Sequence, residues 1–125
     1  MVAMLEDVVL DSGLTTLDTL TSHIFICQAE PTSYAIASTS GLLGSKAWGA
    51  GSAFGSPAAG TSPTGRKVTS VAITDGTITT SGTASWWAAC GTAGLHAHGS
   101  LSSVQAVTSG NTFSLAAFEI KCANQ

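Results

Sequence analysis

The sequence predicts a mainly β protein: a small antiparallel β-sandwich or flattened barrel with one N-terminal α-helix and a long loop or arm rich in Gly, Ser and Ala. Three observations support this fold class. Short runs rich in β-branched residues recur along the second half of the chain, turn residues separate these runs, and leucines at helical spacing occur near the N-terminus. With 125 residues the chain is one domain with a core of modest size.

The centre of the predicted fold is a β-hairpin. Lys67–Ile73 forms its first strand, and Thr77–Cys90 forms the second, passing through Gly82. Asp75-Gly76 between them suits a type I′ turn. Because side chains alternate along a strand, Trp86 and Trp87 should point to opposite faces. One of them anchors a core, and the other meets a second sheet, a loop or another protein.

Residues 1–22 are expected to form the N-terminal helix, with the helical pattern running from Leu5 to Thr21. The apolar stripe consists of Leu10, Leu14 and Leu17, flanked by Val9 and Leu20. Asp7, Asp11 and Asp18 form a second stripe. This acidic stripe is expected to be a solvated face, and the alternative is a surface for a basic partner.

After a short apolar strand at His23–Gln28, closed by Pro31, the residues 34–37 predict another short strand or an irregular connection. Residues 38–65 are dominated by small residues and predict an extended loop or arm. Four large apolar residues argue against plain disorder of this arm. They are Leu42, Leu43, Trp48 and Phe54. Packing on the chain's own sheet and packing on a neighbour are both open.

The β core is assigned to residues 66–122. Leu95–Leu101 alternates between apolar and polar residues, and Val104–Val107 continues it or forms a further strand. In Thr112–Cys122 the apolar alternation changes phase at Ala116-Ala117. A β-bulge produces such a change, so this strand should bend there, as strands do when they cross between sheets.

The charge content excludes some classes of function. Charged residues make up 9% of the chain, against roughly 25% in ordinary globular domains. The net charge is −3 and the four basic residues form no run, so a nucleic-acid partner is not expected. No apolar stretch is long enough to span a membrane, and the acidic start does not read as a secretory signal. So few charges suit a chain embedded in an assembly.

No catalytic motif or cofactor site is predicted, and the protein is not expected to be an enzyme. His96 and His98 share one strand face and, with His23, have the residue types of a zinc site; a surface or interface pair is the favoured interpretation. Cys27, Cys90 and Cys122 are an odd number of thiols, best read as buried apolar residues. A disulfide within or between chains, with Cys122 as a member, is the alternative.

Seven short motifs resemble a group of small virion structural proteins of tailed phages and prophages, often of α-proteobacterial hosts. The motifs cover nearly the whole chain and are turn and strand signatures. They are Leu10 to Asp18, Cys27 to Tyr34, Leu43 to Lys46, Ser62 to Val68, Ile73 to Thr77, Gly82 to Trp86 and Ser103 to Phe113. Where the group usually carries an aspartate in the turn after the tryptophan strand, this chain has Cys90 to Gly94, which leaves the role of Cys90 open.

The resemblance implies a virion component, and a decoration (cement) protein of the head is the first expectation. Its partners would be the major capsid protein or other virion proteins, at the capsid surface, after synthesis in the bacterial cytoplasm. A homotrimer is expected. The alternatives are a neck, collar or tail component, or a receptor- or glycan-binding virion module. The expected interface residues are Trp48, Phe54, Leu42, Leu43, Trp86 and Trp87.

Overall fold

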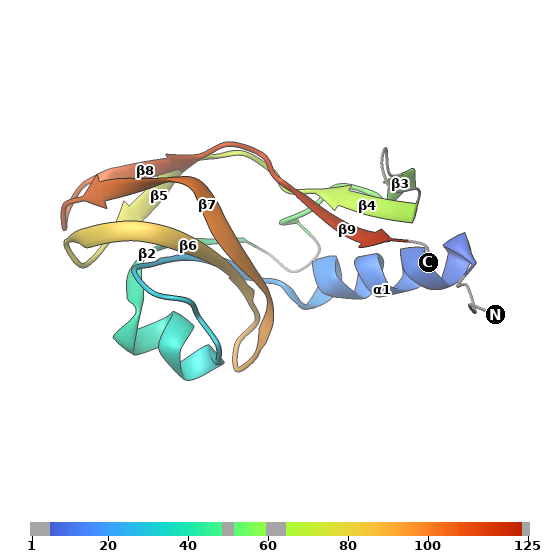
Figure 1. The fold of residues 1–125 in the computed structure, drawn as a ribbon, viewed down its shortest axis with the longest axis horizontal. Coiled ribbons are helices and arrows are strands. Elements are labelled where there is room, and N and C mark those ends of the chain that lie inside the picture. The colour runs from blue at the N-terminus through green and yellow to red at the C-terminus, as the bar shows by residue number, and fades with distance from the viewer. Residues whose placement is uncertain (1–5, 49–51, 60–64, 124–125) are drawn as a thin grey trace.

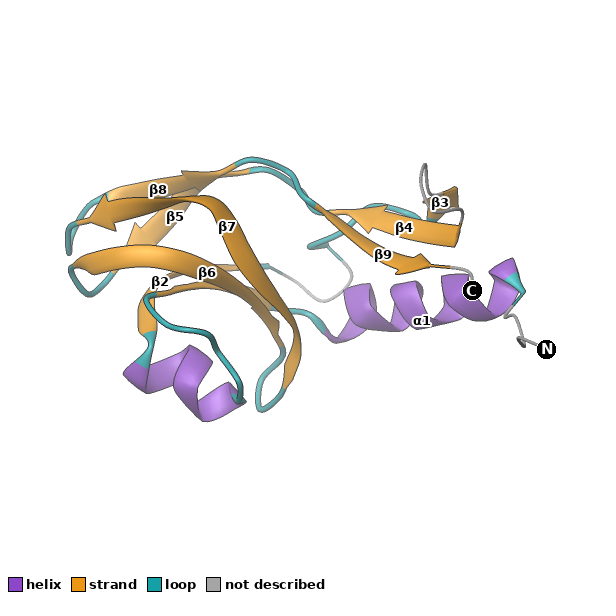
Figure 2. Ribbon diagram, viewed as in Figure 1, coloured by secondary structure: helices purple, strands orange, loops and turns teal. Residues whose placement is uncertain are grey.

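A computed structural model of the chain describes residues 6–48, 52–59 and 65–123. The fold is mainly β with one N-terminal helix and two antiparallel sheets, as the sequence predicts (Figures 1 and 2). The elements are α1 (Asp7–Leu20), β1 (His23–Cys27), the short π-helix η1 (Ile36–Ser40), β2 (Leu42–Ala47), β3 (Ala58–Ala59), β4 (Gly65–Thr69), β5 (Ile73–Ile78), β6 (Gly82–Cys90), β7 (Leu95–Val107), β8 (Thr112–Leu115) and β9 (Glu119–Ala123).

The larger sheet has six strands in the order β7-β6-β1-β2-β5-β8 and curls into a half-barrel. The smaller sheet has the order β3-β4-β9. Two segments link the sheets: β4 leads into β5, and β8 leads into β9. The two segments run antiparallel to one another, since β4 pairs with β9 and β5 pairs with β8. Figure 1 shows these segments as a ribbon that leaves the half-barrel and passes over α1. The expected bend at Ala116-Ala117 lies where this ribbon passes from one sheet to the other.

The helix docks through the predicted leucine stripe. Leu10 and Leu14 are buried, and Leu17 packs on the core cluster that contains Leu14. The two flanking residues, Val9 and Leu20, are exposed instead. Apolar packing therefore holds α1 against β4 and Phe54, which compensates for the weak helix propensity at a glycine inside the helix.

The acidic stripe of α1 is not simply a solvated face. Asp11 forms a salt bridge with Arg66 of β4, with Nε and Oδ1 2.6 Å apart. Asp18 accepts a hydrogen bond from the backbone N–H of Phe54 at 2.9 Å. Asp11 thus ties the helix to β4, and Asp18 ties it to the backbone at Phe54. The side chain of Asp7, the third acidic residue, lies outside the described residues.

The predicted hairpin with a turn at Asp75-Gly76 is wrong. These two residues lie in the middle of β5, and Gly110 is the one residue with positive φ in the described part of the chain. β5 pairs with β2 and β8, whereas β4 pairs with β9, so the two halves of the expected hairpin never meet. Gly76 is required here for a different reason: a Cβ at this position would overlap the ring of Phe113.

The sheet around β1 is covered on both faces. On its concave face, Ile26, Leu43 and Ala84 form one buried cluster. On the opposite face, Phe25 and Cys27 pack with residues of η1 and β6 in a second cluster. This explains why β1 is apolar at successive positions rather than at alternate ones. The residues 34–37, expected to be a strand or an irregular connection, are helical together with 38–40, and this helical segment covers the second face.

The prediction of one extended arm over residues 38–65 is wrong. Its first part completes η1, and β2 follows as an inner strand of the half-barrel. Within β2, Leu43 is 0% exposed, and further along Phe54 is 4% exposed. Residues 49–51 and 60–64 of the expected arm lie outside the described residues, but Phe54 between them is in the core, and a short bridge joins it to Ser70. The large apolar residues of this segment therefore stabilise the chain's own fold.

Candidate interaction surface

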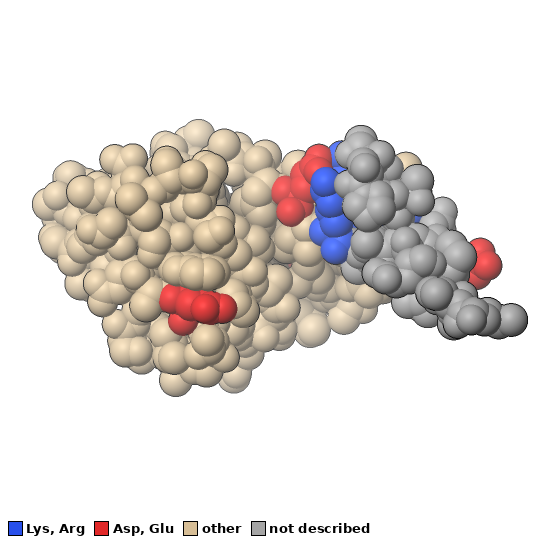
Figure 3. All heavy atoms as spheres, in the orientation of Figure 1, with Lys and Arg blue, Asp and Glu red and all other residues tan. Residues whose placement is uncertain are grey.

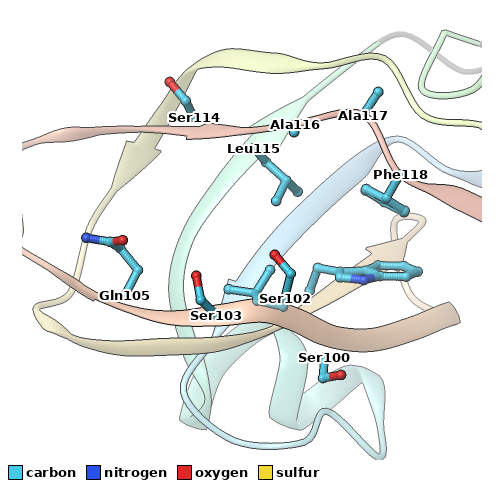
Figure 4. A pocket seen from close by; sticks show the side chains of 11 residues that line it. Ser100, Ser102, Ser103, Gln105, Ser114, Leu115, Ala116, Ala117 and Phe118 are labelled. Carbon is cyan, nitrogen blue, oxygen red and sulfur yellow. The ribbon is translucent and has the colours of Figure 1, made fainter.

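A groove of about 540 Å³ runs along the opening of the half-barrel, between β7 and the segment of β8 that leads to β9. Figure 4 shows Leu115 and Phe118 reaching from one wall toward β7 on the other. The lining residues are Trp87, Ser100, Leu101, Ser102, Ser103, Gln105, Ser114, Leu115, Ala116, Ala117 and Phe118. None of these side chains carries a charge.

The floor of the groove is aromatic and apolar. The rings of Trp87 and Phe118 are in contact, with centroids 4.2 Å apart and planes tilted by 33° to each other. Gly99 lies under the same indole, where a Cβ would come within 2.9 Å of Trp87 Nε1. Trp87, Leu101 and Leu115 are only partly buried although they pack on core clusters. The open side of the half-barrel thus leaves core-type side chains accessible beneath a rim of hydroxyl groups.

β7 is the edge strand on one side of this groove. It is 13 residues long and pairs with β6 alone among the described strands. Its sequence contains no Lys, Arg, Asp, Glu or Pro. These are the residues that commonly prevent an edge strand from pairing with another chain. Val104 near its end is 67% exposed.

A bulge divides β7. Trp86 pairs with Ser100, but Ala84 pairs with Gln105, so the four residues from Leu101 to Val104 have no register partner on β6. Residues 95–100 form the longer regular stretch, apart from one shift at Ala89/Cys90. On the N-terminal side of the bulge, residues 95–100 therefore present an outer edge about as long as a typical strand.

The charged side chains are largely engaged with one another. Lys46 contacts Asp75 at 2.9 Å, and Lys67 contacts Glu119 at 2.6 Å. The hydrogen bond from Lys67 lowers the pKa of Glu119, with a further contribution from Lys121. Figure 3 shows one acidic spot on the half-barrel, a mixed cluster at the ribbon end and one more acidic group at the far right edge, while the rest of the half-barrel on this side is uncharged. The half-barrel therefore offers a predominantly neutral surface on this side.

The predicted interface residues occupy several different places. Leu43 and Phe54 are buried in the core, so neither is available to a partner, and their assignment as interface anchors is wrong. Leu42 and Trp48 are partly buried and pack on core clusters. These two side chains support the chain's own fold, and a role in binding a partner stays a prediction.

The two adjacent tryptophans do face opposite ways. Trp87 packs on the concave side and forms the groove floor, whereas Trp86 packs with the cluster around Phe25 and Cys27. The ring of Trp86 lies 6.2 Å from that of His98. Ala84 joins the cluster on the Trp87 side, not the Trp86 side expected from strict alternation, because the strand register shifts between Ala84 and Trp86.

Cys27 and Cys90 are free thiols, both 0% exposed, in the cluster under η1. Burial raises the pKa of Cys27 to about 11. Burial raises the pKa of Cys90 to about 12, with a smaller contribution from the nearby Cys27. The side chain of Cys122, the third member of the expected disulfide set, lies outside the described residues.

We expect Cys27 and Cys90 to be unreactive in the native protein. Only the thiolate attacks alkylating agents, and raised pKa values keep both groups protonated at pH 8. In a Cys122→Ser variant these are the only thiols, so iodoacetamide followed by mass spectrometry should label neither until denaturant is added. Rapid labelling of the folded variant would contradict the buried placement.

The histidines do not converge. His98 lies 3.4 Å from the Glu30 carboxylate, and His23 Nδ1 shares a hydrogen bond with the Ser22 hydroxyl at 2.8 Å. His96 lies beside the turn that joins β6 to β7, next to Gly91 and Gly94. Among the described residues no group of three His, Cys, Asp or Glu side chains is arranged to hold a metal ion.

Sequence reasoning missed the groove and the edge of β7. The one local signal was the absence of charge and proline from residues 95–107. That signal does not distinguish an inner strand from an edge strand, because the neighbours of a strand are decided by pairing over long sequence separations.

Comparison with known proteins gives no relative. No protein-family description, curated protein or solved structure matches the chain. No helix in the described part of the chain is both long and apolar enough to cross a membrane.

Proposed function

We propose that this chain is a structural protein of a tailed-phage virion, and that it decorates the head and stabilises the shell through contacts between subunits. The observation that carries the proposal is the edge of β7, which lies beside an apolar groove and has no charged residue or proline to prevent pairing with another chain. A protein that stays monomeric in water normally protects such an edge. The proposed partners are the major capsid protein or other virion proteins.

The surface chemistry fits a protein that functions by association. A specific interface buries roughly 800 Å² on each partner and places aromatic side chains near its centre. In the groove, Trp87 and Phe118 are such aromatic residues, and serine hydroxyls surround them. Few charges would need to be desolvated on binding, because the groove lining has none. Repetition of the contact around a closed shell would strengthen a weak individual interaction.

The interface in this proposal differs from the one expected from the sequence. Phe54 and Leu43 are replaced by the groove floor and the edge of β7, since the former are core residues. The proposed role stays the same, because subunit contacts need an accessible apolar surface and not a particular segment to supply it.

The test is the number and position of copies in purified particles. We expect on the order of hundreds of copies per particle, spread over the head, as quantitative mass spectrometry and electron microscopy would show. Particles from a deletion mutant should release their DNA at a lower temperature than wild-type particles.

Other outcomes of the same measurement would replace the proposal. About six or twelve copies at one vertex would indicate a neck or tail ring. Absence of the chain from purified particles would overturn a virion role altogether. Binding of glycans by the isolated protein would favour the receptor-binding alternative, although Phe118 already covers one face of the Trp87 ring.

A further inference from the structure

We infer that the outer edge of β7, chiefly residues 95–100, pairs in antiparallel fashion with the same stretch of a second copy of this chain. The inference names a binding surface and its occupant, and it goes beyond the proposed role in a virion. It does not depend on that role, because the purified chain alone is enough to test it.

The first step is the unpaired backbone. β7 is hydrogen-bonded to β6 on one side, and β8, across the groove, is paired to β5 and not to β7. The outward N–H and C=O groups of residues 95–100 therefore have no strand partner in the described chain. An edge of this kind is a template for another strand, and the six residues from Leu95 to Ser100 match the usual length of a strand.

The second step is the choice of a second copy as the occupant. A two-fold axis brings the same segment of both chains together, so any carboxylate, ammonium or guanidinium group on it would face its own kind. β7 carries none of these groups over its whole length; its titratable side chains are His96 and His98, of which His98 already faces the Glu30 carboxylate of its own chain. Small side chains such as Ala97, Gly99 and Ser100 also keep the edge free of steric obstruction. The edge is thus compatible with itself.

The third step separates a two-fold dimer from a cyclic trimer. A ring of three copies would need β7 to pair with a different edge of the next copy, and β8 is the free edge at the other side of the half-barrel. β8 has only four residues. Its continuation in β9 carries Glu119 and Lys121, which protect that edge. Pairing of β7 with β7 gives the longer and less hindered contact.

Sedimentation velocity of the purified chain over a range of concentrations tests the inference. We expect the wild-type protein to form dimers at micromolar concentration. Ser100→Lys places an ammonium group at an exposed position of the pairing stretch and should weaken the dimer at least tenfold. The matched control is Ser12→Lys, at an exposed serine of α1 away from β7, which should leave the dimer unchanged. Circular dichroism confirms that both variants are folded.

Four results would overturn the inference. These are a wild-type chain that stays monomeric, a wild-type trimer, a Ser100→Lys protein that dimerises as wild type does, and equal weakening by the Ser12→Lys control. None of these results bears on whether the chain is found in virions, which the copy-number measurement decides separately.

Discussion

Replacing Phe54 by alanine is expected to lower the free energy of unfolding by about 3–5 kcal/mol. The side chain is 4% exposed and lies in a cluster with Leu14 of α1 and Ile24 of β1. Its ring meets that of Phe118 edge to face, with centroids 6.3 Å apart and an interplanar angle of 87°. Truncation leaves a cavity where the helix, the half-barrel and the ribbon meet, so the loss should spread to the whole domain.

Urea denaturation followed by tryptophan fluorescence measures this change. The control is Leu20→Ala. Because Leu20 is 52% exposed, its truncation should lower the free energy of unfolding much less than Phe54→Ala does. Unchanged stability of the Phe54→Ala protein would mean that this segment is detached from the core, as the arm expected from the sequence would be.

Replacing Gly44 by alanine should destabilise the fold by about 1–3 kcal/mol, although it adds a single methyl group. A Cβ at this position would lie 2.5 Å from the backbone oxygen of Thr77 and 3.2 Å from Ile78 Cα. Both atoms belong to the backbone of β5, which pairs with β2 at this point. Backbone atoms cannot rotate away as a side-chain end does, so the two strands must separate locally.

Gly13→Ala is the matched control for this substitution, measured in the same denaturation experiment. A Cβ on Gly13 meets no atom within 4 Å, and the residue lies inside α1. Alanine there should stabilise the protein by up to about 1 kcal/mol, because it has the higher helix propensity. Opposite signs for the two substitutions support the placement of both glycines, whereas a neutral Gly44→Ala would contradict the close approach of β2 and β5.

Local sequence patterns predicted where the helix and the strands lie better than they predicted which strands pair. The leucine spacing of α1 and the bend at Ala116-Ala117 depend on residues close in sequence, and both appear as expected. The strand expected over Thr77–Cys90 is confirmed only from Gly82 onward, because the chain leaves β5 after Ile78 and starts β6 at Gly82. The sequence Asp75-Gly76 fits a tight turn, but it fits equally a strand in which the glycine makes room for an aromatic ring. The ring is that of Phe113, far along the chain, so only the tertiary fold distinguishes the two.

The composition of residues 38–65 was misread for a related reason. Small residues suggest a loop, but Gly44 is small because β5 crosses its Cα closely, and Leu43 beside it is fully buried. The candidate surface was harder still to predict. Its groove joins β7 to a segment beyond β8, and both the groove and the edge exist only because those two strands do not pair.

Hydrogen–deuterium exchange of β7 tests most directly whether this protein works by covering its neutral edge with other chains. The exchange rates are compared between the dilute purified chain and the same chain in assembled particles. We expect amides in residues 95–107 to exchange more slowly in the particles, while amides of the exposed face of α1 change little. Equal exchange of β7 in both states would contradict the account, because the edge would then face water throughout the life of the protein.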